Sequence, residues 1–440
     1  MPPPQAPKRD VVWADGLRGI ASVLVVTAHI CRSLVPHLLS PAMSDKLPPT
    51  LFQLPFFRCL VMGRASVAAF ALLAGYVNSL KPIKLSRAGN ADAALSSVAK
   101  SSFRRTGRFV APAIIATFCS WLVCQFGGYN VAHVADSAWI RDTSPTASPS
   151  FAAAIYDLFK NLGTTWLDGF NAYDRIQWTL TYLLKGSMMT YLTLFATVYV
   201  KPKWRFFILA ALYYFKFKGG DALIGFNVYC GMFLAELTLD PDVQNYAAEH
   251  NLARSLSSGS LIILGLFFMS YPEENPSWTR WSKFLLRLGN YIFPTGVEYA
   301  RYYPGFGANL LTLGILFNNT AKKILSHSFF CWMGKLSFPI YLLHAPLIRT
   351  VLTWALFGAS VRPDQGKDAE GNQLPPGWLP IANRWVCVIA IPLFYVFLYR
   401  VANLWATYVD PFCGKVTNWF EELVFRDDAK VQTEKPLLMT

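Results

Sequence analysis

The chain alternates between long apolar segments and short polar ones, and this pattern predicts its helices. A membrane-spanning helix needs about 20 mostly apolar residues, and about ten segments approach that length and character. They lie near residues 16–38, 56–79, 109–127, 178–199, 204–216, 222–238, 255–271, 306–320, 336–357 and 382–406. A shorter apolar stretch, 151–163, is predicted to form a helix at the membrane interface. We therefore expect an all-α fold, a polytopic transmembrane helical bundle with about ten spans.

The two ends of the chain differ from this apolar region. Residues 1–10 (MPPPQAPKRD) are rich in proline and charge and are predicted to be disordered. They lack the apolar core and the cleavage site of a signal peptide. One transmembrane domain is predicted over residues 11–408, followed by a C-terminal tail over residues 409–440.

The composition excludes a soluble or a disordered protein. Hydrophobic residues make up 53% of the chain and charged residues only 15%, whereas soluble proteins carry about 25% charge. That is too little charged surface for the three soluble domains that 440 residues would otherwise suggest. The eight cysteines are scattered, without a CxxC pair or histidines at zinc-ligand spacing. We therefore expect neither a disulfide scaffold nor a bound metal.

The net charge of +14 is concentrated in polar loops. Residues 81–108 contain many lysines and arginines but a single acid, Asp92. Because the segment lacks interleaved aromatic residues and lies between apolar segments, we expect no nucleic-acid partner. Cytoplasmic loops of membrane proteins are enriched in Lys and Arg, so this loop and, with an even number of spans, both termini are predicted to be cytosolic. A multi-pass chain without a cleaved signal is expected in the endoplasmic reticulum.

The first predicted span contains three ionisable residues, Asp15, Arg18 and His29. His29 lies eleven positions after Arg18, which is close to three helical turns, so the two side chains share a face about 16 Å apart along the axis. Asp15 falls on that face as well. Ionisable groups at such depth usually face a cavity and serve function. The alternative is that His29 is only hydrogen-bonded within the bundle.

Two further segments carry candidate chemistry. Arg105 and Arg108, three residues apart, face the same side of a helix, and their planar guanidinium groups suit phosphate oxygens; they could also be simple topology determinants. The ninth predicted span holds Tyr341 and His344 one turn apart, with Ser337 before them. Two intramembrane imidazoles together with arginines at one mouth indicate acid–base chemistry on a substrate with an anionic end.

These segments resemble, in order along the chain, the motifs of the acyltransferase-3 family of membrane acyltransferases. The family opens with an arginine, ten intervening residues and a histidine, then has a second-span block ending in an aromatic turn, an RxxR-then-proline motif and a late Ser–Tyr–Leu–His–Pro block. The matching segments here are DGLRGIASVLVVTAH, GRASVAAFALLAGYVNSLKP, FRRTGRFVAP and GKLSFPIYLLHAPLI. They span residues 11 to about 400 and look most like the fungal branch of the family.

The resemblance implies transfer of an acyl group, usually acetyl, from acyl-CoA to a hydroxyl group. Acyl-CoA would be a cosubstrate, with no bound cofactor. Arg18, Arg105 and Arg108 are expected to contact the phosphates of coenzyme A at the cytosolic mouth.

His29 is the expected general base, because an imidazole titrates near pH 6.5. His344 or Tyr341 would position the acceptor or stabilise the tetrahedral oxyanion.

One block departs from the fungal pattern. Trp178, Lys185 and Ser187 match a family block and are candidate substrate-binding residues, but Leu183 stands where a glutamate is common. Asp174, Asp221 or Glu236 could replace that lost carboxylate.

We expect an O-acyltransferase acting on a small lipophilic metabolite of fungal secondary metabolism. Two alternatives stay open: a polytopic transporter, although no internal repeat supports it, and a catalytically impaired family member that acts as a binding subunit.

Overall fold

The computed structural model describes residues 11–366 and 374–425, so the predicted disorder of residues 1–10 lies outside the described part. The helices are, in chain order, α1 (Val12–Leu34), α2 (Gly63–Arg87), α3 (Ala91–Gln125), α4 (Ala138–Thr143), α5 (Phe151–Leu167), α6 (Trp178–Thr197), α7 (Pro202–Lys218), α8 (Gly225–Thr238), α9 (Pro241–Glu249), α10 (Asn251–Met269), α11 (Arg280–Ile292), α12 (Tyr299–Phe317), α13 (Asn319–Leu325), α14 (Ser328–Lys335), α15 (Ser337–Leu347), α16 (Thr353–Phe357) and α17 (Arg384–Val424). Within the described ranges there is no β-strand, only an isolated bridge between Ala135 and Leu379.

The structure confirms the all-α membrane bundle. Each predicted span falls on a helix, and six helical segments are long and apolar enough to cross a membrane: α1, α2, α3, α10, Ser337–Phe357 and Trp385–Val424. The total of about ten spans stays a prediction. The stretch predicted as an interfacial helix is the first part of α5, and its place relative to a membrane is untested.

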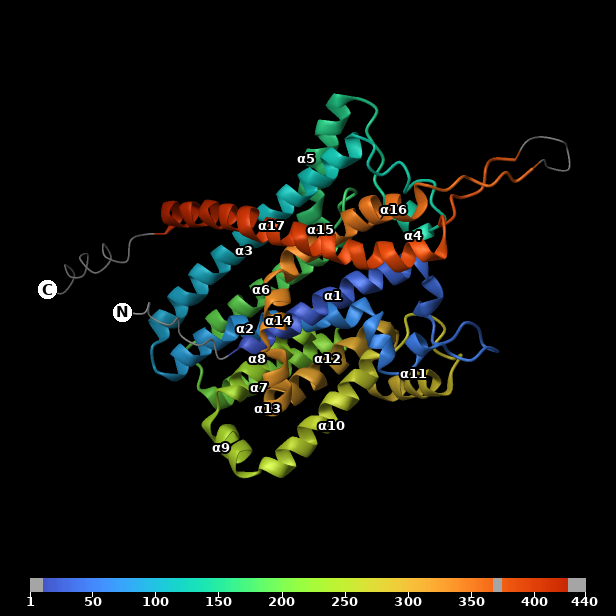
Figure 1. Ribbon diagram of the computed structural model, residues 1–440. Coiled ribbons are helices and arrows are strands. Elements are labelled where there is room, and N and C mark those ends of the chain that lie inside the picture. Colours follow the sequence, from blue (N-terminus) through green and yellow to red (C-terminus); the bar gives the residue numbers. More distant parts are fainter. Residues whose placement is uncertain (1–10, 367–373, 426–440) are drawn as a thin grey trace, which may run out of the picture.

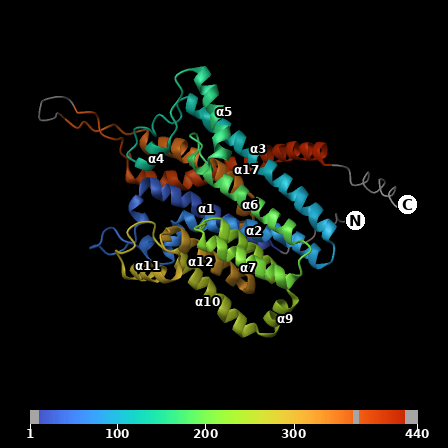
Figure 2. The same cartoon turned by 180° about the vertical axis from the view of Figure 1, so that it is seen from behind.

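The bundle has two ends that differ in their helices (Figures 1 and 2). The start of α1, the end of α17, the turn between α2 and α3, and helices α9 and α13 lie toward one end, which we call the α9 end. Helices α4 and α11 lie at the opposite end, which we call the α11 end.

Close backbone contacts hold the helices together, as expected where helices pack in a membrane through small residues. Helices α2 and α8 meet at Gly75 and Gly231. A Cβ atom on Gly75 would lie 2.2 Å from the carbonyl oxygen of Val228, and one on Gly231 would lie 2.1 Å from that of Leu72. Any larger residue at either position would push α8 away from α2.

A buried network of ion pairs connects α8 to α2 and α7 near the α9 end. Glu236 on α8 is fully buried and accepts hydrogen bonds from Arg205 on α7 and Arg87 on α2, both at 2.7 Å. The guanidinium of Arg205 is only 1% exposed. A buried carboxylate needs such partners, so Arg205 belongs to the interior of the bundle.

The last helix continues past residue 408, where the transmembrane domain is predicted to end. Helix α17 reaches Val424, so residues 409–424 are helical; the division into a domain and a tail stays a prediction. The extension is held against α3 by an ion pair between Arg104 and Glu421 at 2.5 Å, and Cys413 is buried. Hydropathy identified only the apolar part of α17, because its polar end is stabilised by contacts with another helix.

Candidate active site

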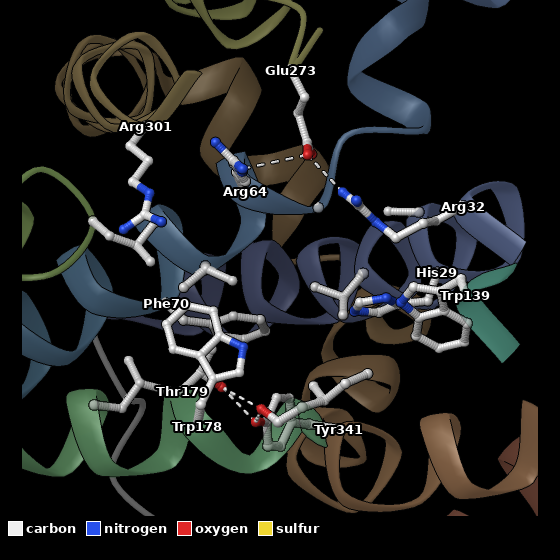
Figure 3. A pocket seen from close by; sticks show the side chains of 17 residues that line it. His29, Arg32, Arg64, Phe70, Trp139, Trp178, Thr179, Glu273, Arg301 and Tyr341 are labelled. Carbon is white, nitrogen blue, oxygen red and sulfur yellow. Dashed lines mark hydrogen bonds and ion pairs between the residues drawn. The ribbon is translucent and has the colours of Figure 1, made fainter. Parts of the chain in front are cut away.

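A cavity of about 300 Å³ lies between α1, α2, α4, α6 and α15, and its lining reaches Glu273 in the loop before α11; we call it the histidine pocket (Figure 3). His29 lines it from α1, together with Trp139 from α4 and Trp178 from α6. Figure 3 shows His29 and Trp139 side by side, and their ring centroids are 5.4 Å apart. Six aliphatic side chains add apolar surface to the remaining wall, and four charged ones, Arg32, Arg64, Glu273 and Arg301, also line it. The pocket therefore suits a molecule that is largely apolar but carries a polar group.

The two intramembrane histidines lie next to each other. The ring centroids of His29 and His344 are 5.3 Å apart. His344 Nδ1 lies 3.0 Å from the carbonyl oxygen of Ile340 and 2.8 Å from that of Tyr341. Because a carbonyl oxygen only accepts, Nδ1 must carry the proton, and Nε2 of the neutral ring is then an acceptor. Both His344 Nε2 and His29 Nδ1 are buried without a hydrogen-bond partner among the described residues.

The hydroxyl groups of Thr179 and Tyr341 contact each other in the lining of the histidine pocket. Tyr341 donates to the carbonyl oxygen of Ile176 at 2.6 Å and shares a short hydrogen bond with the hydroxyl of Thr179 (Figure 3). This links α15 to the start of α6. The predicted residue Tyr341 is therefore held in place by the backbone of the segment that precedes α6.

The predicted arginines gather in a second cavity of about 260 Å³, which we call the arginine pocket. Arg18 from α1 and both Arg105 and Arg108 from α3 line it. Arg18 is paired with Asp15 one turn earlier. Arg105 donates from Nε to the hydroxyl of Ser187 at 3.3 Å.

The two pockets are adjacent, because Phe70, Leu183 and Tyr341 line both. These three side chains come from α2, α6 and α15 and separate the arginines from the histidines. A molecule with a polar head in the arginine pocket could therefore extend an arm past them to His29. This arrangement suits a reaction between two substrates that occupy different pockets.

Comparison with known proteins identifies the family. A family model described as an acyltransferase domain matches residues 11–398. The chain belongs to the acyltransferase-3 family. It is 28% identical to the O-acetyltransferase PaAT-1 of Phomopsis amygdali over 455 aligned positions, covering 94% of this chain and 85% of that protein.

Two further fungal relatives of this acyltransferase are 22% identical to it. The alignment with acyltransferase R4 of a Phoma species covers 90% of this chain and 95% of R4. The alignment with acyltransferase clz18 of Cochliobolus lunatus covers 76% of this chain and 82% of clz18. No solved structure matches the chain.

The other predicted site residues of the acyltransferase lie at different distances from the two pockets. Trp178 lines the histidine pocket, and Ser187 reaches the site only through its hydrogen bond with Arg105. Lys185 lines neither pocket; it is exposed on the outer face of α6, with its ammonium group 5.6 Å from the centroid of the Tyr182 ring. The structure thus does not bring Lys185 into the site.

Sequence reasoning missed a charged group on the α11 side of the histidine pocket. Glu273, in the loop before α11, lies between Arg32 of α1 and Arg64 of α2, at 2.6 Å and 3.5 Å (Figure 3). Glu273 is 6% exposed, whereas the two arginines are about one-third exposed. No motif in the sequence marks Arg32, Arg64 or Glu273.

Leu183 borders both pockets, as expected for a residue at the position of a family glutamate. None of the three proposed replacements lines either pocket. Asp174 is buried in an ion pair with Arg349 at 3.2 Å, Asp221 pairs with Lys216 at 3.3 Å, and Glu236 belongs to the network between α7 and α8. Among the described residues that line the histidine pocket, the acid is Glu273.

Proposed function

We propose that this O-acyltransferase transfers an acetyl group from acetyl-CoA to a hydroxyl group of a small lipophilic metabolite in fungal secondary metabolism. The observation that carries the proposal is the pair of adjacent pockets, one lined by arginines and the other by His29, which meet at Phe70, Leu183 and Tyr341. The name of the relative PaAT-1, an O-acetyltransferase, supports acetyl as the group transferred.

In the proposed complex, the arginine pocket holds the phosphates of coenzyme A. Arg18, Arg105 and Arg108 supply positive charge there, and guanidinium groups match phosphate oxygens in geometry. The pantetheine arm then passes Leu183 and presents its thioester to His29. The distance along α1 from Arg18 to His29, about 16 Å, is one that an extended arm can cover.

The acceptor occupies the histidine pocket. His29 removes the proton from the acceptor hydroxyl as its oxygen attacks the thioester carbonyl carbon. His344 Nε2 is an unoccupied acceptor beside His29, so it stabilises the imidazolium that forms. The indole N–H of Trp178, which has no acceptor among the described residues, stabilises the oxyanion. The carbon–sulfur bond then breaks, and the leaving thiolate takes the proton from His29.

The acceptor enters from the α11 end and the donor from the α9 end. The histidine pocket reaches the α11 side through Arg32, Arg64 and Glu273, whereas the arginine pocket lies on the other side of Leu183. Because acyl-CoA is cytosolic, the α9 end faces the cytosol, which places both termini there. The membrane is that of the endoplasmic reticulum.

One assay tests this function. Purified protein in detergent receives radiolabelled acetyl-CoA and an extract of fungal metabolites, and His29→Ala serves as the matched control. Label in an organic-soluble product from wild type but not from the variant supports the proposal. Binding of acetyl-CoA without transfer would make the protein a binding subunit, and neither binding nor transfer would refute the donor assignment.

A further inference from the structure

A third cavity, of about 520 Å³, lies at the α9 end, outside the two pockets of the active site. Its walls come from the end of α2, the α8–α9 segment, the start of α10 and the α12–α13 junction. Four basic residues line it, and we call it the lysine pocket: Lys81, Lys84, Arg254 and Lys322. The described lining residues include no aspartate or glutamate.

The charge of the lysine pocket is uncompensated in the described part of the structure. Arg254 is held by the carbonyl oxygen of Ala247 and the side-chain oxygen of Asn251, both at 2.7 Å and both uncharged. Burial, and next the charge of Arg254, lower the pKa of Lys322. Cations brought together without a counter-charge favour the binding of an anion.

The lysine pocket is separate from the arginine pocket. No residue in the described part of the chain lines both. On α2 the lysine pocket is lined by Tyr76, Leu80, Lys81 and Lys84, whereas the arginine pocket is lined mainly by residues one to two turns earlier, from Phe70 to Asn78. The buried Trp13 of α1 packs beside Tyr76, and the centroids of the two rings are 5.6 Å apart. The lysine pocket is thus not an extension of the proposed donor site.

The geometry points to a binding site for a phosphate monoester in the lysine pocket, carried either by the headgroup of an anionic membrane lipid or by a soluble metabolite. A phosphate monoester brings a charge of about −1.5 to −2 and several acceptor oxygens, which matches several converging cations. Gln244 and Asn319 in the same wall add amide donors.

Exposed apolar side chains next to the lysine pocket would allow a membrane lipid to reach it. Arg254 lies in the first turn of α10, a helix with exposed apolar side chains such as Leu256 and Ile263. Basic pockets between membrane helices on the cytosolic side are recognised sites for lipid headgroups.

Native mass spectrometry of the full-length protein in detergent tests the site. Wild type is incubated with phosphatidate or with phosphatidylcholine, and a parallel titration by calorimetry uses soluble glycerol 3-phosphate. The test variant is Lys84→Gln combined with Lys322→Gln, because neither side chain has a described structural partner. Lys323→Gln is the control, since Lys323 is exposed on the same helix and does not line the pocket.

We expect wild type to retain phosphatidate in preference to phosphatidylcholine, or to bind glycerol phosphate, and the double variant to bind roughly ten-fold more weakly or worse. The control should bind like wild type. Preference for phosphatidate alone identifies a lipid site, and equal binding of glycerol phosphate identifies a soluble ligand. Absence of both, or a double variant that weakens only acetyl-CoA binding, would overturn the proposal. Acetyl transfer by the double variant distinguishes this failure from failure of the proposed function.

Discussion

Arg105 and Arg108 offer a graded test of the donor site, because the structure places them differently. Arg105 is half-buried, its guanidinium lies 4.4 Å from the centroid of the Phe109 ring, and Ser187 holds its Nε. Its terminal nitrogens have no acceptor among the described residues and are left for a phosphate. Arg108 lines the same pocket but is exposed to solvent.

These differences set the expected magnitudes. A hydrogen bond to a charged group contributes about 1.5–3 kcal/mol, so Arg105→Ala should weaken acetyl-CoA binding roughly ten-fold to more than a hundred-fold. An exposed ion pair contributes about 0–1 kcal/mol, so Arg108→Ala should weaken it by at most about five-fold. Ser187→Ala removes a neutral hydrogen bond of about 1 kcal/mol that orients Arg105. That variant should fall between the two.

Binding of acetyl-CoA by isothermal titration, at low and at high salt, measures all three variants. The loss from Arg108→Ala should shrink at high salt, since solvent screens an exposed charge, whereas the loss from Arg105→Ala should persist. Arg105→Lys should recover only part of the affinity, because an ammonium lacks the planar fork. If Arg105→Ala bound acetyl-CoA like wild type, or the two alanine variants lost equal affinity, the donor phosphates would lie elsewhere.

Three further predictions concern the histidine pocket. His29→Ala should lower turnover by about 10²–10⁴-fold with an unchanged gel-filtration profile; retention of more than about half the rate would refute its role as base. Leu183→Glu should fold and alter turnover or acceptor range, because this position borders two cavities; aggregation would contradict that placement. Glu273→Gln should change the Michaelis constant for the acceptor several-fold, as Arg32 and Arg64 lose their shared carboxylate; a change confined to the donor constant would contradict acceptor entry from the α11 end.

The helices could be predicted from hydropathy, but their ends could not. A run of about 20 apolar residues locates the part of a helix that crosses a membrane, and every such run here lies on a helix. Helices α3 and α17 extend well beyond their apolar runs, over 35 and 41 residues. The polar extensions are stabilised by each other, through the pair between Arg104 and Glu421. Hydropathy contains no information about such a contact.

Local helix geometry predicted part of the site and packing supplied the rest. The common face of Arg18 and His29 follows from the helical period alone. That period also separates Leu183 from Lys185: two residues apart is about 200° around a helix, so only one of them can face the pockets. The contact between His29 and His344 depends on how α1 and α15 pack, and Glu273 reaches the pocket from a loop. No local sequence pattern indicates either the contact between the histidines or the position of Glu273.

The partners of each charged side chain separate structural charges from those available to substrates. Arg205 and Arg349 are 1% exposed and each is paired with a buried carboxylate, so their charge is already neutralised. Arg105 has no carboxylate partner in the described part of the chain; its Nε donates to a neutral hydroxyl, an aromatic ring packs against it, and it faces a cavity. Charged residues make up only 15% of this chain. A cation that faces a cavity without a carboxylate is costly to desolvate unless an anionic ligand neutralises its charge. The same reasoning favours Arg105 for the proposed contact with the donor phosphates and gives Arg349, which follows α15, a structural role through its pair with Asp174.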